Sequence, residues 1–344
     1  MAGLAGADSG RLHGADGRLW VTERTLNTVT AYDAATGRVL GTTPVGLAPI
    51  GVVEPTGTGK AYSSDESSVP PTVSVIDADT VTVVKKIPTG VRPHHMYTTR
   101  NGRWVFVGEF GQNTVGVIDT RTDTRITGCP ASPNPAARTH APWAIRGGRL
   151  VFATNEVTND IAVMRFDGTT CELLYNVPVG NRPSEILVPE RGRLAYVSVR
   201  NEDKVKEVDL RTRTVTREVF VGEQPDTLQL LPDRRTLIVA LRLAPPRITY
   251  IDTRTFEAEI VPIEAGSITG HEWLSKNGRY TFVAVENAPN GHVAVVDNRS
   301  RTVVATYPYP VGGRPHACIS RRARATRTRT TTMRTTRITT TSAS

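Results

Sequence analysis

The sequence alternates apolar and polar positions in short runs, without the wider apolar stripes of amphipathic helices. Residues 103–119 are a clear example, with two stretches rich in Val separated by a polar turn. Alternation over roughly four to eight residues indicates half-buried β-strands, and β-branched residues favour that conformation. The pattern therefore predicts an all-β fold with almost no helix.

An aspartate ends one strand of each unit, and a short turn rich in Thr and Arg follows it. These aspartates are Asp33, Asp77, Asp119, Asp167, Asp209, Asp252 and Asp297. Their intervals range from 42 residues (Asp77 to Asp119) to 48 residues (Asp119 to Asp167). A period of about 40–45 residues is typical of four-stranded propeller blades, and we expect the aspartates to accept hydrogen bonds from turn amides. Seven repeats predict a seven-bladed β-propeller.

The two ends of the repeat region look like parts of one blade. Residues 18–22 resemble a second strand, and residues 314–320 resemble a first strand. Pairing between them would close the ring and remove a free inner edge. We expect one propeller domain over residues 18–320, a flexible leader over residues 1–17 and a disordered tail over residues 321–344.

Two recurring segments carry a family resemblance. Residues 114–122 and residues 179–183 resemble the repeat of YVTN-type β-propellers, and the similarity extends over nearly all of residues 18–320. That family includes surface-layer-type and exported binding proteins, lactonase-like enzymes and subunits of redox complexes, so the resemblance implies the fold and narrows the chemistry little. Residues 19–23 are also similar to a strand of virginiamycin-lyase-like propellers, whose chemistry uses histidine and a divalent ion. The rest of the repeat matches that family less well.

The first strand of each blade lines the central channel of a propeller, and most of these strands begin at a proline. The residues that follow this leading position are Ile50, His94, Trp143, Ser184, Asp226, His271 and His316. Three of the seven histidines therefore share one predicted position. Neutral imidazoles are common ligands of Cu, Fe and Zn. The pattern predicts a metal site of His94, His271 and His316, with histidines that only bind channel water as the alternative.

Other polar residues fall near the same end of the channel. His95 is expected to point away from it unless the strand is bulged. The acids predicted to carry protons are Glu272, Glu185 and Asp226. The residues predicted to bind substrate are Arg92, Arg182, Arg314, Trp143, His140 and Glu109. Arginine forks suit an anionic substrate, although pairing with glutamates of nearby loops is an equally valid interpretation.

Together these residues predict a metal-dependent enzyme, an oxidoreductase or a lyase or hydrolase, that acts on a small anionic molecule at the channel mouth. The alternative is a non-enzymatic binding or scaffold propeller. No Gly-rich phosphate loop or nucleophile elbow occurs in the sequence, so no nucleotide cofactor is expected. We expect a monomer.

The net charge of +9 and the isoelectric point near 9.7 are typical of proteins that bind nucleic acids. However, residues 321–344 contain seven arginines and no acid, which leaves only +2 for the rest of the chain. A cationic tail without aromatic residues offers only sequence-blind attraction to phosphates. We therefore expect no specific nucleic-acid partner.

The remaining sequence features bear on compartment and covalent links. Cys129, Cys171 and Cys318 allow at most one disulfide, with the pairing left open. No apolar run reaches about 18 residues, so no membrane span is expected. The sequence shows no signal peptide, which favours a cytoplasmic location as written, or a periplasmic or extracellular one if a signal has been removed.

Overall fold

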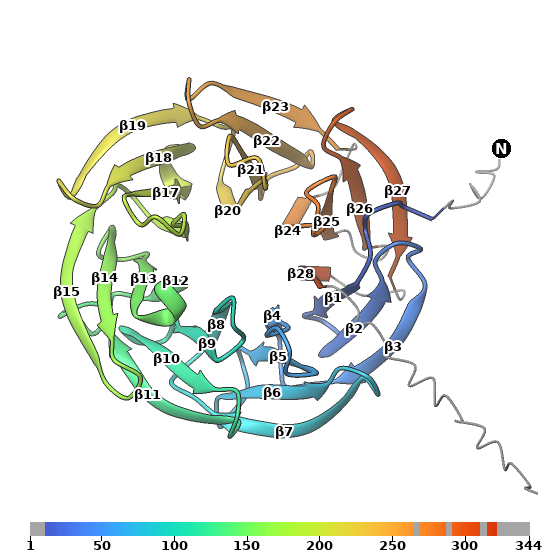
Figure 1. Ribbon diagram of the computed structural model, residues 1–344, viewed down its shortest axis with the longest axis horizontal. Helices are drawn as coiled ribbons and strands as arrows, with labels where there is room; N and C mark the ends of the chain where they lie inside the picture. The colour runs from blue at the N-terminus through green and yellow to red at the C-terminus, as the bar shows by residue number, and fades with distance from the viewer. Residues whose placement is uncertain (1–10, 264–267, 287–290, 310–314, 322–344) are drawn as a thin grey trace, which may run out of the picture.

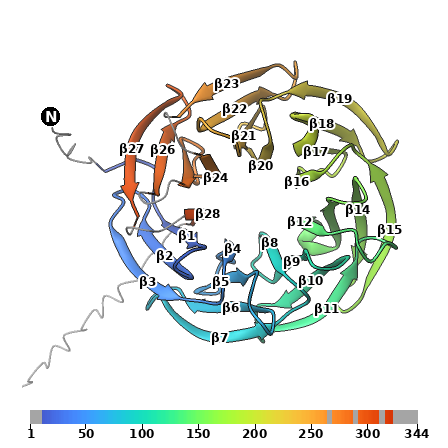
Figure 2. The same cartoon turned by 180° about the vertical axis from the view of Figure 1, so that it is seen from behind.

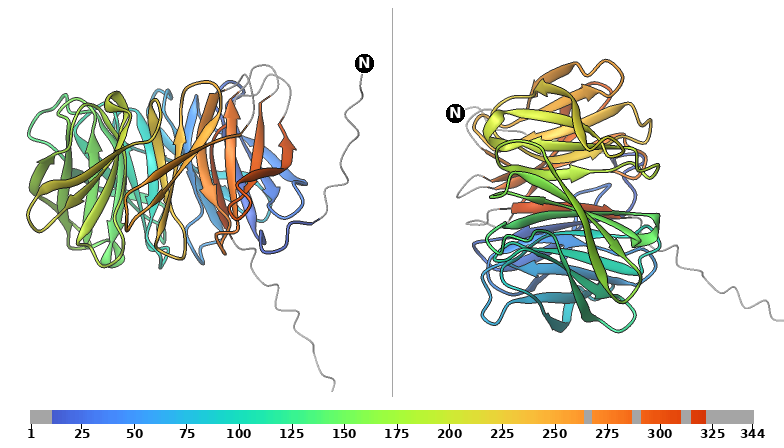
Figure 3. Two further views of the ribbon diagram at one scale, coloured as in Figure 1. Left: turned by 90° about the horizontal axis from the view of Figure 1, so that it is seen from above. Right: turned by 90° about the vertical axis from the view of Figure 1, so that its left-hand side faces the viewer.

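Seven four-stranded antiparallel sheets surround a central channel, which confirms the predicted fold (Figure 1). The structure is a computed structural model that describes residues 11–263, 268–286, 291–309 and 315–321, with the backbone alone for residues 317–321. In every blade the first strand lies innermost and the fourth strand lies at the rim. The sheets stand on edge around the channel, as the two side views show (Figure 3).

The strand bounds follow the repeat. The closing blade consists of β28 (Pro315–Arg321), β1 (Arg18–Glu23), β2 (Thr28–Asp33) and β3 (Val39–Pro44). The next blade has β4 (Pro49–Val53), β5 (Lys60–Asp65), β6 (Thr72–Asp77) and β7 (Thr82–Pro88). After it come β8 (Pro93–Thr98), β9 (Trp104–Glu109), β10 (Thr114–Asp119) and β11 (Thr124–Pro130). The following blade contains β12 (Thr139–Ile145), β13 (Leu150–Asn155), β14 (Asp160–Phe166) and β15 (Cys171–Pro178).

Three further blades complete the ring. The first has β16 (Pro183–Leu187), β17 (Leu194–Val199), β18 (Lys204–Asp209) and β19 (Thr214–Phe220). The second has β20 (Pro225–Leu230), β21 (Thr236–Leu241), β22 (Arg247–Asp252) and β23 (Ala258–Pro262). The third has β24 (Ile268–Leu274), β25 (Tyr280–Glu286), β26 (His292–Asp297) and β27 (Thr302–Pro308). The helices in the described part are two 3₁₀ turns, η1 (Arg146–Gly148) and η2 (Arg200–Glu202), and neither has the length or apolarity to cross a membrane.

The ring closes by pairing between the two ends of the chain. Strand β28 lies beside β1 with antiparallel register, for example Leu19 opposite Ser320 (Figure 2). Part of the predicted leader is packed rather than flexible, because the Leu12 amide donates to the Ala35 carbonyl and Ala15 is fully buried. Residues 1–10 and 322–344 lie outside the described residues, and with them most of the predicted tail.

Neighbouring blades pack face to face through the apolar residues of their middle strands. Phe106 and Val117 of one blade, for instance, share a buried cluster with Val151 and Ala162 of the next. A disulfide between Cys129 and Cys171, 42 residues apart, joins the outer strands of these same two blades. The side chain of Cys318 lies outside the described ones. The apolar residues of the alternating pattern thus form the hydrophobic core between neighbouring sheets.

The aspartate at the end of each third strand caps the following turn, as predicted. The Asp252 carboxylate accepts hydrogen bonds from the amides of Arg254 (2.7 Å) and Thr255 (3.1 Å). Asp167 accepts from the amides of Thr169 and Thr170, both at 2.8 Å. These aspartates therefore satisfy turn amides.

These turn hydrogen bonds predict a defined loss of stability in acid. Backbone hydrogen bonds hold the pKa of Asp167 and Asp252 below the ordinary value. A depressed pKa in the folded state contributes stability that is present above the unfolded value of about 3.9 and is lost as the pH falls through the folded pKa. We expect the contribution of these aspartates to the urea midpoint of unfolding to stay level above pH about 5 and to be lost below pH about 4.

The matched variants for this test are Asp252→Asn and Asp79→Asn. Asp252→Asn should flatten the acid limb of the midpoint curve, whereas Asp79→Asn, at an exposed turn residue, should leave it unchanged. Identical acid limbs for Asp252→Asn and the natural sequence would contradict this role of the turn aspartates.

Candidate functional site

Each first strand contains a β-bulge near its start, directly after its first paired residue in six blades and after its second paired residue, Thr269, in β24. In the blade of β8, for example, Pro93 pairs with Glu109, and the next pair is Met96 with Val107. The extra residue allows two consecutive side chains to face the channel. Accordingly, the rings of His94 and His95 stack with centroids 4.8 Å apart.

The bulges line the channel with two layers of residues, which we call the upper and lower tiers. The upper tier, directly after the paired residue, is Ile50, His94, His140, Ser184, Asp226, Gly270 and His316. The lower tier, one residue further on, includes Gly51, His95, Ala141, Glu185, Thr227 and His271. The upper tier lies toward the mouth, the end at which the first strands begin.

The pairing corrects two positions of the sequence-based alignment. Thr139 pairs with Asn155 before the bulge of β12, so His140 belongs to the upper tier and Trp143 does not. Thr269 pairs with Val285 before the bulge of β24, which places His271 in the lower tier. The prediction that His94, His271 and His316 occupy one structural position is therefore wrong for His271. No proline precedes the bulge in these two blades, and Pro142 and Gly270 were aligned in its place.

Five histidines form one continuous cluster in the channel. The ring-centroid distances are 4.5 Å for His94 and His140, 4.3 Å for His95 and His140, 4.5 Å for His95 and His271, and 4.4 Å for His271 and His316. The residues come from β8, β12, β24 and β28. The convergence of histidines on the channel was thus predictable, and its membership is larger than the sequence indicated.

Three members of this cluster have the spacing of a metal site. One side-chain nitrogen from each of His94, His95 and His140 lies within 4.8 Å of the other two. The set shares only His94 with the predicted ligands; His271 and His316 lie beside it in the same cluster. Metal binding itself stays a prediction.

Hydrogen bonds orient two of the three imidazoles. His140 Nδ1 lies 2.6 Å from the Ser184 carbonyl oxygen, which can only accept, so Nδ1 carries the proton and Nε2 keeps its lone pair. His95 Nδ1 lies 2.9 Å from a Glu185 carboxylate oxygen, an arrangement typical of histidines that bind metals. His94 Nδ1 is buried and has no hydrogen-bond partner among the described residues. Each ring can therefore present a nitrogen lone pair.

Burial favours the neutral form of four histidines in the cluster. It lowers the pKa of His94 and of His140 well below the ordinary value, and the neighbouring imidazoles add to this effect. The pKa of His271 falls well below it for the same reasons. Burial also lowers the pKa of His316, although the nearby Glu286 opposes the shift. Neutral imidazole is the form that binds a transition metal.

Above the histidines, a polar chamber of about 340 Å³ opens at the mouth. Its charged lining residues are Arg24, Arg92, Arg182, Arg200, Arg242, Glu66 and Glu156. A volume above about 300 Å³ is sufficient for a small molecule. This chamber coincides with the end of the channel at which the sequence placed its substrate site.

Arginines and glutamates pair around this chamber, as one interpretation of the sequence had it. Arg92 forms an ion pair with Glu66, and Arg182 lies 3.2 Å from Glu156. The side chains of Arg92 and Arg182 nevertheless remain 47% and 44% exposed, so their outer N–H groups can still reach a bound anion. Arg92 (φ 54°) and Arg182 (φ 61°) share a left-handed conformation with Ala48, Arg138 and Gln224, which directly precede the first strand in other blades, so this conformation belongs to the repeated turn. Arg314 lies outside the described residues.

The carboxylates of the chamber also border the candidate metal ligands. Glu66 Oε1 lies 3.9 Å from His94 Nε2, and Glu156 Oε1 lies 3.6 Å from His140 Nε2. From the sequence, the glutamates of these loops were considered only as partners of arginine. The repeat contains a signal that these residues meet in space. Each of four charged residues directly follows a second strand and so occupies the same position in its blade: Glu66, Glu156, Arg200 and Arg242.

The predicted proton-carrying acids occupy three different surroundings. Asp226 is fully buried and pairs with Arg200 (2.5 Å) and Arg242 (3.3 Å). Burial opposes its ionisation, but the two arginines hold the pKa of its carboxyl well below the ordinary value. Glu185 supports His95, and burial raises the pKa of its carboxyl.

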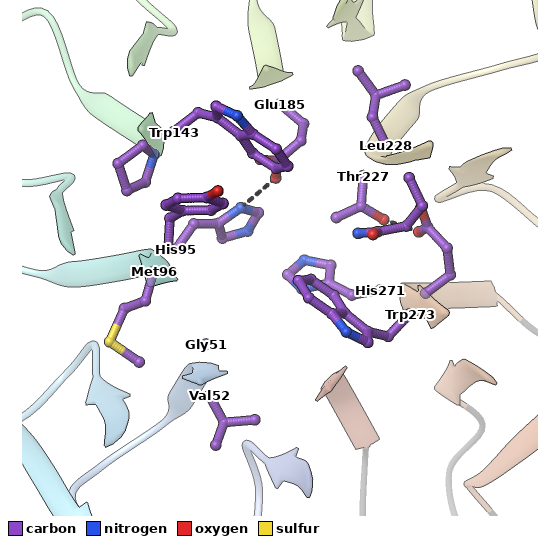
Figure 4. Close-up of a pocket in the computed structure, with 14 residues that line it drawn as sticks. Gly51, Val52, His95, Met96, Trp143, Glu185, Thr227, Leu228, His271 and Trp273 are labelled. Carbon is purple, nitrogen blue, oxygen red and sulfur yellow. Dashed lines mark hydrogen bonds and ion pairs between the residues drawn. The ribbon is translucent and has the colours of Figure 1, made fainter. Parts of the chain in front are cut away.

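Glu272 and Trp143 lie below the histidines rather than at the mouth. Both line a second, smaller chamber of about 50 Å³ together with His95, Glu185 and His271 (Figure 4). Burial raises the pKa of Glu272 to about 8. We refer to the two cavities as the upper and lower chambers.

Glu109 is enclosed away from both chambers. Its side chain is fully buried, and its carboxylate accepts hydrogen bonds from the Gly90 amide and from Arg125, both at 2.7 Å. A substrate-binding role for Glu109 finds no support in this position, which is that of a structural ion pair.

The recurring bulges and the seven blades agree with a sequence comparison. A family model described as YNCE-like β-propeller matches residues 65–342. The chain belongs to this family. A search of curated proteins finds no match to this YNCE-like propeller.

Solved structures similar to this YNCE-like propeller share its fold at low sequence identity. A protein from Bacteroides uniformis, provisionally assigned as a 6-phosphogluconolactonase, has a TM-score of 0.72 and 17% identity, over 88% of this chain and 99% of that one. The periplasmic gluconolactonase PpgL of Pseudomonas aeruginosa has a TM-score of 0.67 and 18% identity, over 88% and 98% of the two chains. The dihydro-heme d1 dehydrogenase NirN has a TM-score of 0.61 and 16% identity, over 88% and 75%. At such identities the likeness concerns the fold alone.

Proposed function

We propose that this propeller is a metal-dependent enzyme that acts on a small anionic substrate in the upper chamber. The observation that carries the proposal is the group of three imidazoles at His94, His95 and His140, whose nitrogens lie within 4.8 Å of one another and two of which are oriented by hydrogen bonds. Three histidine nitrogens with open positions suit a catalytic Zn²⁺, Cu²⁺ or Fe²⁺. Such an ion would polarise a substrate oxygen as a Lewis acid.

The surrounding residues have distinct roles in this proposal. The exposed guanidinium groups of Arg92 and Arg182 bind and orient the anion, because their forks match carboxylate and phosphate oxygens. Glu66 and Glu156 lie next to the ligand histidines and can accept a proton from a nucleophile or return one to a leaving group. Glu185 holds the His95 ring in place.

Hydrolysis is the reaction class that we favour over oxidoreductase or lyase chemistry. Two of the similar folds carry descriptions as gluconolactonases, one of them for a phosphorylated sugar lactone. A lactone bearing a phosphate would suit a chamber in which five arginines outnumber the carboxylates Glu66, Glu156 and Asp226. These similarities support the choice of first substrate only by analogy.

The test uses purified protein loaded with Zn²⁺, Cu²⁺ or Fe²⁺, with 6-phosphogluconolactone and the uncharged gluconolactone as substrates. We expect metal-dependent hydrolysis, lost with a chelator, that is faster for the phosphorylated lactone. Arg92→Gln should raise KM for the phosphorylated lactone by about tenfold, since it removes a charged hydrogen bond, and should affect the neutral lactone little.

The matched control is Arg100→Gln, which removes an arginine that is 77% exposed and does not line the chamber. This variant should retain both activities. Protein that binds no metal and hydrolyses neither lactone would instead favour the non-enzymatic binding propeller.

A further inference from the structure

The lower chamber differs in its chemistry from the upper one. Its lining includes the aromatic side chains of Tyr97, Trp143 and Trp273 and the acids Glu185 and Glu272. No lysine or arginine is among the described residues that line it. Five arginines line the upper chamber. The channel is therefore cationic above the histidine cluster and acidic and aromatic below it.

Glu272 presents an unused acceptor to this chamber. Its side chain is fully buried. One carboxylate oxygen accepts a hydrogen bond from the Thr227 hydroxyl. The other oxygen, Oε1, has no hydrogen-bond partner among the described residues. A buried carboxylate oxygen without a donor is costly and is uncommon unless a ligand completes it.

Aromatic rings lie on two sides of the chamber. Trp143 and Glu185 lie on one side of the chamber, whereas Trp273 and His271 lie on the other (Figure 4). The rings of Tyr97 and Trp143 are held together with centroids 4.4 Å apart, and the indole N–H of Trp143 donates to the Val188 carbonyl at 2.8 Å. These contacts fix the Trp143 ring as a rigid wall. Its π-face attracts a cation.

We propose that the lower chamber binds an organic ammonium group, with Glu272 as the counter-charge and Trp143 and Trp273 as cation–π walls. The N–H or N-methyl groups of such a ligand would satisfy Glu272 Oε1, and its charge would meet no opposing cation in the lining. Trp143, Trp273 and Gln229 are partly exposed, so the chamber can be reached from the face opposite the mouth. This site borders the proposed metal site, because His95 and Glu185 line the chamber, but ammonium binding to Glu272 needs neither the metal nor substrate turnover.

The small volume of about 50 Å³ calls for small probes. The protein has four tryptophans, so the indole N–H signals in an NMR titration report on the chamber once Trp143→Phe and Trp273→Phe have assigned them. Methylammonium and tetramethylammonium are the charged probes, and methanol and tert-butanol are uncharged probes of nearly the same shape. The titration is run at pH about 9, where Glu272, with a pKa of about 8, is mostly ionised. We expect at least one ammonium ion to shift the Trp143 and Trp273 signals and to bind about tenfold more tightly than its uncharged counterpart, which corresponds to ~1.4 kcal/mol.

Two variants test the assignment to Glu272. Glu272→Gln keeps the size of the side chain and removes its charge, so it should weaken ammonium binding by about tenfold. Glu190→Gln changes a partly exposed acid that does not line the chamber and should leave binding unchanged. Equal binding of charged and uncharged probes, equal binding by Glu272→Gln, or no shift with either ammonium ion would each overturn the proposal. The test needs no metal and no substrate turnover, so its failure would leave the proposed function untouched.

Discussion

Replacement of His140 by alanine is expected to weaken metal binding by at least about 100-fold, because it removes one of three ligands, and loss even of a supporting contact costs 10–100-fold. His140 contributes a buried Nε2 lone pair, since its Nδ1 is held by the Ser184 carbonyl. Titration calorimetry with Zn²⁺ measures the dissociation constant, and elemental analysis measures the metal content of the purified protein. The same loss is expected for His95→Ala.

Two further histidine variants show which residues are ligands. His13→Ala removes an exposed histidine outside the channel and should have no effect. His316→Ala should have a small effect if His94, His95 and His140 bind the metal, and a large one if His94, His271 and His316 do. Unchanged metal binding by both His140→Ala and His95→Ala would disprove the ligand set favoured by the structure.

The largest effect on stability is expected at Arg200. Its side chain is only 7% exposed and joins the buried carboxylates of Glu156 (3.2 Å) and Asp226 (2.5 Å). Removing one partner of a buried ion pair leaves an uncompensated charge and costs about 3–5 kcal/mol. We expect Arg200→Ala to lower the free energy of unfolding by this amount, as measured in urea at neutral pH.

The control for this measurement is Arg165→Ala. Arg165 also pairs with a glutamate, Glu172, but the two side chains are 63% and 58% exposed. Pairs of this kind contribute about 0–1 kcal/mol. Equal small losses in both variants would show that Arg242 alone neutralises Asp226.

The propeller was predictable because its information is local and repeated. Each strand of five to eight residues carries its own alternation, and each turn aspartate marks where a third strand ends. Closure followed from counting strands at the two ends, and pairing of Leu19 with Ser320 confirms it. No long-range information was needed for these steps.

The site was less predictable because it depends on register between strands. Proline marks the start of the bulge in five blades, whereas Thr139 and Thr269 take that position in the other two. A bulge is a property of a strand pair, so the sequence of one strand does not reveal it. This is why His140 and His271 were assigned to the wrong positions. From the sequence, His95 was expected to point away from the channel only if its strand had no bulge.

Burial also separated residues that looked equivalent in the sequence. Glu109 and Glu66 both follow the apolar part of a second strand. One additional residue places Glu66 beside His94, while Glu109 faces Arg125 inside its blade. A period of two along a strand means that such a shift reverses the direction of the side chain.

The seven bulges give the channel wall a modular character. Because every first strand is bulged at the same place, each blade offers two adjacent sites whose backbone is already shaped to hold an inward side chain. A substitution at Ile50 or Gly51, in the one fully described blade without a polar side chain in either tier, would introduce a new functional group without a new loop. The fold can therefore change its chemistry one position at a time, and a protein engineer could extend the histidine cluster to a neighbouring blade by such a replacement.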